Sequence, residues 1–392
     1  MKRMELIFLA MGLFLFTQVA QADWTPARRL TWSSVDSCLP RVFVDNSGKV
    51  HLVWYEGSPE YPDYGNGEIH YRKSADGGAS WTTNKMIIDN QSDSKTPDIA
   101  VDSSYRVHVV WDDAQYFSGG GNSNIVYKKS ANGGVTWSYL KCLTWSYLWN
   151  RNPDITVDSS DDLHLVWEDD TPGNREIYYR KSTDAGTTWS TSKRLTWTAG
   201  ASVYPAVCAD SSNKIHVFWN DDTPGNDEIY YRKTTDGGAT WSSVQRLTWS
   251  AGASENPAVA ADSFGNLHLM WADYTPGDYE VFYRKSTDGG GIWSSSKRLT
   301  WTAGESEFPA ISVDSSNEIH VVWNDNVAGN NEIYYAKSTD GGSNWTTSQR
   351  ITYSAGHSWH AVIASDSSGN LHVLWSDNTP GNYQIFYKKF IK

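Results

Sequence analysis

A motif of the form His-x-x-Trp recurs seven times along the 392-residue chain and constrains its fold more than any other feature. Successive tryptophans are separated by 57 and 56 residues and then four times by 52 residues. The pairs are His51 and Trp54, His108 and Trp111, His164 and Trp167, His216 and Trp219, His268 and Trp271, His320 and Trp323, and His372 and Trp375. A repeat of about 50 residues indicates a propeller or a solenoid.

Each repeat is expected to contain four short strands. In the fifth unit, Pro257–Ala261 predicts the first strand and Leu267–Trp271 the second, with a turn rich in Gly and Asn between them. Aromatic and β-branched residues at 280–285 predict the third strand, and the segment from Trp293 to about Trp301 predicts the fourth. Helical periodicity is absent from this region. The sequence therefore predicts an all-β fold, a seven-bladed β-propeller of four-stranded antiparallel blades.

The two ends of the chain are expected to share the last blade. A second tryptophan series leads the fourth strands at Trp81, Trp137, Trp189, Trp241, Trp293 and Trp345. Its 52-residue spacing places the next member beyond Lys392. The segment Trp24–Trp32 matches Trp189–Trp197 in spacing and in its Arg-Leu-Thr-Trp ending. We therefore expect residues 23–32 to complete the blade begun at His360, which would leave no exposed sheet edge.

The blades are expected at about residues 40–96, 97–152, 153–204, 205–256, 257–308, 309–359, and 360–392 together with 23–39. Residues 1–22 have the pattern of a signal peptide cleaved near Ala22, with basic Lys2 and Arg3 followed by an apolar run. The sequence thus predicts a secreted or periplasmic protein. No later segment is apolar enough to span a membrane.

Charge and composition narrow the classes of partner. The net charge of −12 argues against binding to nucleic acid, because phosphates require a basic surface. We expect a monomer that needs no cofactor. The acidity would, however, also suit a cation site.

Most of the repeated side chains are expected to be structural. Blade faces stack on one another, so the tryptophans of both series should be core, as should five that end fourth strands: Trp32, Trp145, Trp197, Trp249 and Trp301. The histidine in every blade is expected to link strands by a hydrogen bond rather than to bind metal. Two residues after each strand-two tryptophan lies an acid, which is expected to cap the next turn. Alternatively, part of this ring binds Ca2+, with Asp169, Asp221 and Asp273 as candidates.

Boxes of the form S-x-D-G-G-x-x-W precede the fourth strands. Ser74–Gly78 begins the first, and Thr234–Gly238 and Ser338–Gly342 begin later copies. In these tight turns the Asp accepts backbone N–H groups and the glycines adopt positive φ. These boxes resemble the bacterial neuraminidase repeat, or Asp-box, family. The resemblance implies a β-propeller of the sialidase-like superfamily, with the boxes at the rim away from any active centre.

The resemblance also allows a check for catalytic residues. Sialidases of the family use three arginines for the substrate carboxylate, a Tyr–Glu nucleophile pair and an acid/base Asp, and they usually have six blades. Their first arginine usually lies in an Arg-Ile-Pro motif. The corresponding segment here is Cys38-Leu39-Pro40-Arg41, which does not match, and seven blades are expected.

A candidate site emerges where blades one to three depart from the repeat. The residue after the strand-one proline is Ala in blades four to six. In blades one, two and three it is Arg41, Asp98 and Asp154. Since first strands line the channel, the three side chains are expected to form a charged cluster. That cluster would be either an ion pair at the channel mouth or, with Asp98 and Asp154 as the paired carboxylates, the catalytic centre of a glycosidase.

Loop residues near this arc are candidates for ligand binding. They are Tyr61, Tyr64, Tyr116, Trp149, Arg151, His357, Trp359 and His360. Exposed aromatic rings beside carboxylates suit sugar binding by stacking and hydrogen bonding, although loop aromatics can equally be packing lids.

Three functions remain open. The first is a non-catalytic module that binds a glycan or another surface ligand. The second is an exo-acting glycoside hydrolase of sialidase type, and the third is a structural propeller that binds a protein partner. The close similarity of the repeats and the missing Arg-Ile-Pro motif favour the first and third over the second.

Overall fold

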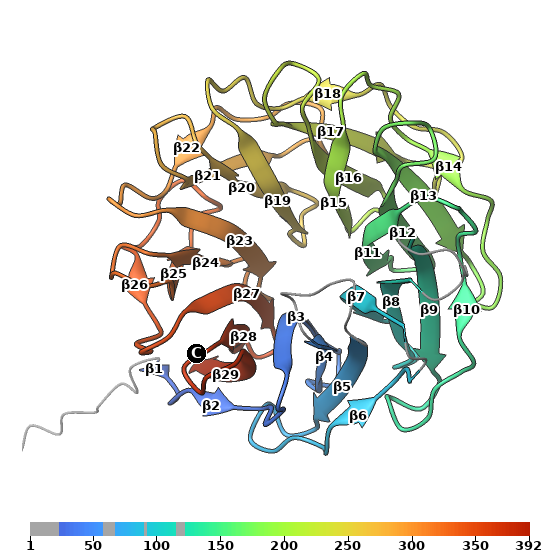
Figure 1. The fold of residues 1–392 in the computed structure, drawn as a ribbon. Coiled ribbons are helices and arrows are strands. Elements are labelled where there is room, and N and C mark those ends of the chain that lie inside the picture. The colour runs from blue at the N-terminus through green and yellow to red at the C-terminus, as the bar shows by residue number, and fades with distance from the viewer. Residues whose placement is uncertain (1–22, 58–66, 90–91, 115–121) are drawn as a thin grey trace, which may run out of the picture.

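The computed structural model describes residues 23–57, 67–89, 92–114 and 122–392. Seven antiparallel sheets surround a central axis, and the described residues contain no helix (Figure 1). The predicted seven-bladed β-propeller is therefore confirmed. No helix in the described part of the chain is long and apolar enough to cross a membrane. The predicted signal peptide and the candidates Tyr61, Tyr64 and Tyr116 lie outside the described residues.

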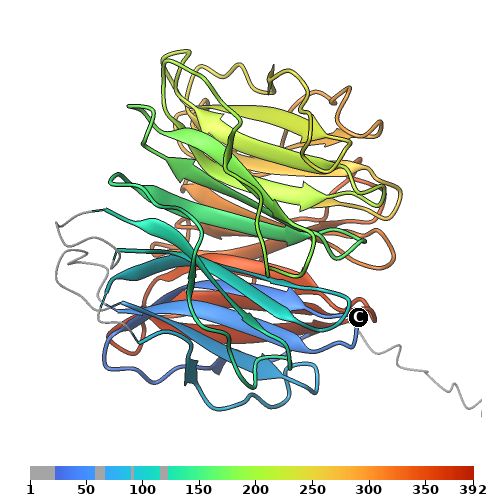
Figure 2. The same cartoon turned by 90° about the vertical axis from the view of Figure 1, so that its right-hand side faces the viewer.

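Each blade runs from an innermost strand at the axis to an outermost strand at the perimeter, and in a side view the sheets stack face to face (Figures 1 and 2). The innermost strands are β3 (Asp36–Val44), β7 (Ser94–Val101), β11 (Asn150–Val157), β15 (Ser202–Ala209), β19 (Ser254–Ala261), β23 (Ser306–Val313) and β27 (Ser358–Ser365). The second strands are β4 (Val50–Gly57), β8 (Val107–Asp113), β12 (Leu163–Asp169), β16 (Ile215–Asp221), β20 (Leu267–Asp273), β24 (Ile319–Asp325) and β28 (Leu371–Asp377).

The outer half of each blade is built from one full strand and one short strand. The third strands are β5 (Glu68–Ser74), β9 (Asn124–Ser130), β13 (Glu176–Ser182), β17 (Glu228–Thr234), β21 (Glu280–Ser286), β25 (Glu332–Ser338) and β29 (Gln384–Ile391). The outermost strands are β6 (Lys85–Met86), β10 (Lys141–Cys142), β14 (Lys193–Arg194), β18 (Gln245–Arg246), β22 (Lys297–Arg298) and β26 (Gln349–Arg350), with β1 (Asp23–Trp24) and β2 (Arg28–Arg29) in the last blade.

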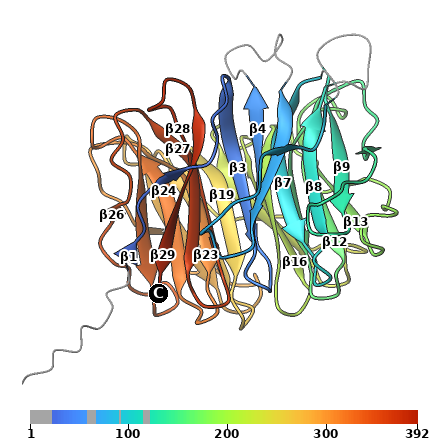
Figure 3. The same cartoon turned by 90° about the horizontal axis from the view of Figure 1, so that it is seen from below.

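The N-terminal segment closes the ring as predicted. Both β1 and β2 pair antiparallel with β29, with Trp24 opposite Phe390 and Arg29 opposite Phe386 (Figure 3). The Trp24 ring lies 5.1 Å from that of Tyr335 in blade six and 5.3 Å from that of Phe390. Residues from the two ends of the chain therefore share one sheet and one hydrophobic contact with the neighbouring blade.

The repeated histidines link strands within each blade. In blade three, His164 Nδ1 lies 2.8 Å from the hydroxyl of Tyr179, and His164 Nε2 lies 3.2 Å from Asp158. The Tyr179 hydroxyl also donates to the carbonyl of Gly237 in the next blade, at 3.4 Å. This chain of contacts joins the first turn, the second and third strands, and the neighbouring box.

The boxes also join neighbouring blades. Gly238 has φ of +92°, and a Cβ on it would lie 2.5 Å from the Tyr179 ring of the preceding blade, so only glycine fits. Trp241, which closes the same box, meets Tyr179 edge-on with ring centres 5.0 Å apart. Asp236 accepts the N–H of Thr240 and fixes the turn. Repetition of these contacts explains why the box recurs.

Two strand boundaries differ from the prediction. The innermost strand expected at Pro257–Ala261 begins earlier, at Ser254, because a bulge lets the chain remain paired across the proline. The fourth strand expected from Trp293 to Trp301 has ladder pairing only at Lys297–Arg298, with single backbone bonds from Ser294 and Leu299 on either side.

One core prediction is wrong. The five tryptophans that follow the outermost strands are not buried between blades. They are 65–69% exposed: Trp32, Trp145, Trp197, Trp249 and Trp301. Stacking covers the faces of the sheets, but these side chains lie past the last paired residues of the outermost strands, where they stay exposed even beside an arginine of the next blade such as Arg232.

Candidate functional site

Every innermost strand carries a bulge near the end where the chain enters the blade. The register shifts there in all seven strands, and the residue before the strand-one proline position has a left-handed φ between 42° and 55°. Such non-glycine conformations are strained and cluster at functional sites. We call the two residues at each bulge a mouth doublet, and the end of the channel that they surround the mouth.

The mouth doublets differ in all seven blades. They are Cys38-Leu39, Lys95-Thr96, Arg151-Asn152, Val203-Tyr204, Glu255-Asn256, Glu307-Phe308 and Trp359-His360. The residues on either side are far more uniform, with a Ser or Asn before the doublet and a proline after six of the seven. The residues that flank the doublets therefore follow the repeat, whereas the doublets themselves differ from blade to blade.

The three predicted charged residues lie together at this ring. The guanidinium of Arg41 lies 3.7 Å from the carboxylate of Asp98. Asp98 also accepts the backbone N–H of Ile155 at 2.8 Å, and Asp154 accepts that of Val207 at 2.8 Å. Burial and the adjacent Asp98 raise the pKa of Asp154 well above its usual range. The two carboxyl groups therefore hold each next blade in register.

A further acid, Glu168, connects blades three and four. Its carboxylate accepts the side-chain N–H of Asn152 at 2.7 Å and the backbone N–H of Tyr204 at 2.7 Å. Arg175 lies 3.9 Å away. Burial raises the pKa of Glu168 despite these donors. Both mouth residues that contact Glu168 are thereby fixed, and the ring of Tyr204 remains 48% exposed.

Two other predicted ligand-binding residues stack on each other. The Arg151 guanidinium lies 3.9 Å from the centre of the Trp149 ring, which is a cation–π geometry. Burial raises the pKa of the neighbouring acids Asp112, to about 6, and Glu168, and the charge of Arg151 offsets only a part of each shift. Lys95, the mouth residue of blade two, pairs with Asp93 at 2.5 Å.

Aromatic side chains occupy the blade six and seven side. Phe308 lies 4.9 Å from His360 and 6.0 Å from Trp359, measured between ring centres. Burial and the nearby Arg41 lower the pKa of His360 to about 4, so this imidazole is neutral at pH 7. The predicted residues Trp359 and His360 thus lie next to the Arg41 and Asp98 pair.

The blade five and six side of the mouth is acidic. The hydroxyl of Tyr279 donates to Glu255 at 3.0 Å. Burial and the carboxylates of Glu305 and Glu255 raise the pKa of Glu307 to about 7. Carboxyl groups therefore gather on the blade five and six side, next to the aromatic residues of blades six and seven.

Other candidates lie elsewhere or are already engaged. The side chain of His357 accepts the N–H of Asn331 at 3.2 Å, in a loop between blades, and is not in the Arg41 cluster. The three calcium candidates cap turns, as each accepts the N–H of a threonine two residues later at 2.7–2.9 Å: Asp169, Asp221 and Asp273. These acids do not converge on one another.

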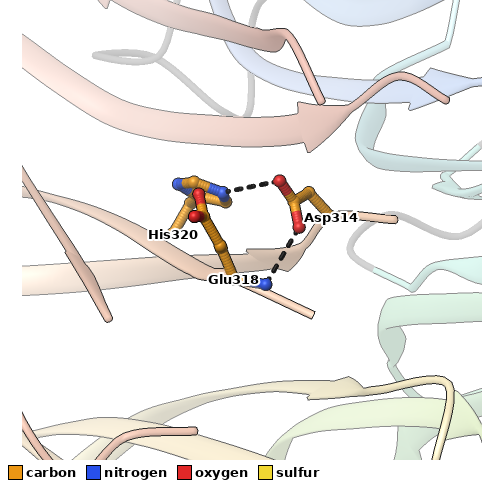
Figure 4. A group of neighbouring side chains, drawn as sticks. All are labelled: Asp314, Glu318 and His320. Atoms are coloured by element: carbon orange, nitrogen blue, oxygen red, sulfur yellow. Dashed lines mark hydrogen bonds and ion pairs between the residues drawn. The ribbon is translucent and has the colours of Figure 1, made fainter. Parts of the chain in front are cut away.

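In the described part of the chain, one group has the spacing of metal ligands. Asp314, Glu318 and His320 point toward one another (Figure 4). The ammonium of Lys392 lies 2.7 Å from Asp314 and 3.1 Å from Glu318. A cation supplied by the chain itself already neutralises this group, and it carries no argument for a metal.

Sequence reasoning missed several mouth residues, namely Glu168, Tyr204, Glu255, Tyr279, Glu307 and Phe308. A usable signal existed in the alignment of the seven repeats. Only the doublet between the Ser or Asn and the proline differs in every copy. The residue after the proline, on which the prediction was based, departs from alanine to a charged residue in only three of the seven blades.

Comparisons with known proteins concern the fold. No family model matches the chain, and no curated protein matches it by sequence. Among solved structures, an ulvan lyase of polysaccharide lyase family PL25 is similar with a TM-score of 0.63 and 12% identity, over 92% of this chain and 95% of that chain. The GH93 α-L-arabinofuranosidase of Fusarium graminearum has a TM-score of 0.56 and 16% identity, over 77% and 93%. The NanB sialidase of Streptococcus pneumoniae has a TM-score of 0.52 and 13% identity, over 93% and 70%. The chain thus has a sialidase-like propeller fold.

Proposed function

We propose that this protein is an exported sialidase-like propeller that binds a glycan at the mouth without cleaving it. The observation that carries the proposal is the set of mouth doublets. Seven blades that repeat closely elsewhere present seven different doublets around one axis. A ring of this kind recognises one ligand of low symmetry, because every blade contributes a different contact.

The chemistry of the mouth favours a carbohydrate. Tyr204, Phe308 and Trp359 offer aromatic rings on which the apolar face of a sugar can stack. Carboxylates and guanidinium groups beside these rings can pair with hydroxyl groups. The structural neighbours named above are a sialidase, an arabinofuranosidase and a polysaccharide lyase, which supports a carbohydrate ligand on grounds of fold alone.

The state of Asp98 and Asp154 argues against their use as a catalytic pair. Asp98 is buried and Asp154 is half-buried, and one oxygen of each accepts a backbone N–H from the next blade. A hydrolase needs one carboxyl group on each side of the scissile bond, about 5–10 Å apart. Asp154 instead hydrogen-bonds with Asp98, which leaves no room for a sugar between them.

A second candidate function, an exo-acting glycoside hydrolase, has one observation in its favour. The hydroxyl of Tyr279 donates to Glu255, which resembles the Tyr–Glu pair that the sialidase resemblance implies. The basic residues Arg41 and Arg151, however, belong to blades one and three, whereas Tyr279 and Glu255 belong to blade five. The binding function therefore has the broader support.

A glycan array combined with turnover of a fluorogenic sialoside tests both functions. We expect the wild-type protein to bind the array without turnover, and Trp359→Ala to weaken binding at least tenfold through loss of a stacking ring. Phe264→Ala serves as the control, because Phe264 is an exposed aromatic in a turn at the opposite end of its blade. Turnover that disappears in Tyr279→Phe would replace the proposal with the hydrolase, and silence in both assays would favour a protein-binding propeller.

A further inference from the structure

Six blades carry an exposed aromatic side chain three residues after the last residue of the outermost strand. We call these the rim aromatics: Trp32, Trp145, Trp197, Trp249, Trp301 and Tyr353. They are 65–76% exposed. Blade one has Asp89 at the same position. Each rim aromatic follows an outermost strand, and these strands lie at the perimeter of the molecule, whereas the mouth doublets belong to the innermost strands at the axis (Figure 1).

The backbone beneath each rim aromatic is held firmly. In blade three, the N–H of Thr198 donates to the buried carboxylate of Glu176 at 3.1 Å, and Arg194 donates to the same carboxylate oxygen at 2.7 Å. Arg194 also donates to the carbonyl of Thr196 at 2.6 Å. The residues on both sides of Trp197 are thus fixed, and the same arrangement recurs in blades four, five and six.

An arginine lies over most of these rings. The guanidinium of Arg194 is 5.6 Å from the centre of the Trp197 ring, and Arg232 of the next blade is 5.8 Å away. Equivalent arginines lie 4.5–5.8 Å from the rings of Trp32, Trp249, Trp301 and Tyr353. In blade three the pairing with Glu176 balances the charge of Arg194. The same arginine–glutamate pair recurs in blades four, five and six, and Arg232 donates to the backbone carbonyls of Leu195 and Ser242. In these four blades the aromatic face is therefore oriented, and the arginine of its own blade is already paired.

Stability does not account for these rings. The backbone N–H groups of Ile177 and Thr198 are bonded without any contribution from the indole, and Trp197 leaves 65% of its surface in water. Replacement by Tyr in blade six keeps the aromatic ring but little else of the indole. What the six positions share is a flat, rigid, exposed aromatic face, which binds ligands with a small loss of side-chain entropy.

The net charge of the protein narrows the classes of ligand that such aromatic faces can bind. A net charge of −12 opposes association with anionic lipid surfaces and with nucleic acid. In blades three to six the arginine that ends the outermost strand is already paired with a buried glutamate and is not free for an acidic group. An uncharged pyranose ring, whose C–H face stacks on indole and whose hydroxyls reach the neighbouring loop carbonyls, fits these conditions.

We propose that the rim aromatics are repeated binding platforms for uncharged pyranose rings of a polymeric or surface-clustered glycan. They are separate from the mouth and do not depend on its proposed function. Each platform binds weakly by itself, since one stacked ring supplies only a few kcal/mol at most. Several platforms on one molecule raise the overall affinity for a polymer by avidity.

Affinity gel electrophoresis with dextran, mannan, laminarin and xyloglucan tests this proposal. We expect at least one polysaccharide to retard the wild-type protein, and the triple variant Trp197→Ala, Trp249→Ala, Trp301→Ala to require at least tenfold more polysaccharide for equal retardation. Each single substitution should give a part of that loss. The corresponding triple change to Tyr should restore most of the binding, because Tyr353 already serves in blade six.

The matched control is Tyr139→Ala, since Tyr139 is 99% exposed in the same outer part of blade two but is not a rim aromatic. Circular dichroism and melting curves of all variants establish that they are folded, and the single variants decide the matter if the triple variant is not. Absence of retardation of the wild type by every polysaccharide would overturn the proposal, as would equal retardation of the folded triple variant.

Three further outcomes would also overturn it. Binding that survives the triple variant but is lost in Trp359→Ala would place polysaccharide binding at the mouth alone. Flotation of the wild type with phosphatidylcholine vesicles, abolished in the triple variant, would assign the ring to a membrane surface. Dimers in sedimentation that disappear in the triple variant would assign it to a second copy of the chain.

Discussion

The second strands of the seven blades are nearly interchangeable, whereas the mouth doublets at the ends of the innermost strands are all different. Each second strand supplies the same histidine and tryptophan, and both are buried in every blade. The doublets supply, in turn, Lys95-Thr96, Arg151-Asn152, Glu255-Asn256 and others. Neighbouring sheets pack at the same spacing all around the ring, so side chains of the same size are needed on the packed face of every blade. The mouth faces solvent, where that requirement ends and each blade can present a different chemistry.

The largest expected effect concerns the framework. Deletion of residues 23–32 removes both outer strands of the last blade and the Trp24 contact with Tyr335. It exposes the edge of β29 and opens the ring, so we expect the melting temperature to fall by more than 10 °C, on the scale of several kcal/mol of lost stability. Differential scanning calorimetry measures it, and an unchanged melting curve would disprove closure by this segment.

A smaller effect on stability is expected when one framework residue and one mouth residue are each replaced by alanine. His164→Ala leaves Tyr179 and Asp158 without their buried partner, and we expect a loss of about 3 kcal/mol in the free energy of unfolding. Tyr204→Ala removes a half-exposed mouth side chain and should change it by less than about 1 kcal/mol. Chemical denaturation of the two variants provides the comparison, and similar losses in both would contradict the distinction between framework and mouth.

The smallest effect is a difference in pH dependence. Burial lowers the pKa of five framework histidines, namely His108, His216, His268, His320 and, to about 4, His372. The unfolded chain therefore takes up protons first, and stability should fall as pH decreases from about 6.5 to 4. Glu307 has the opposite sign. Its folded pKa of about 7 exceeds the unfolded value, so the folded state loses relative stability as pH rises from about 4.5 to 7.

Glu307→Gln should therefore raise the melting temperature by a few degrees at pH 8 and leave it nearly unchanged at pH 4. Phe264→Ala, which changes an exposed residue in a turn, is a control for nonspecific effects. A Gln variant that is equally affected at both pH values would show that Glu307 is not held protonated by its neighbours.

Much of the fold could be predicted because propeller repeats are local. The 52-residue spacing, the Arg-Leu-Thr-Trp ending of Trp24–Trp32 and the pattern of each blade predict seven sheets and their closure. The candidate site was predicted in part. Arg41, Asp98 and Asp154 depart visibly from a repeated alanine, so their proximity follows from the ring. Glu168 and Phe308 were missed because their roles depend on contacts with the next blade, which no single repeat contains.

The sequence by itself determined the architecture of this protein, since each blade carries its own turns, strand pattern and buried histidine and tryptophan. Only the tertiary structure decided which side chains meet across blades and which remain in water. The bulge that aims each doublet toward the mouth, and the solvent around Trp197 and its counterparts, both arise where stacked sheets end. Hydrophobic pattern reports the probability of burial, but the edge of a sheet is a property of the assembled ring.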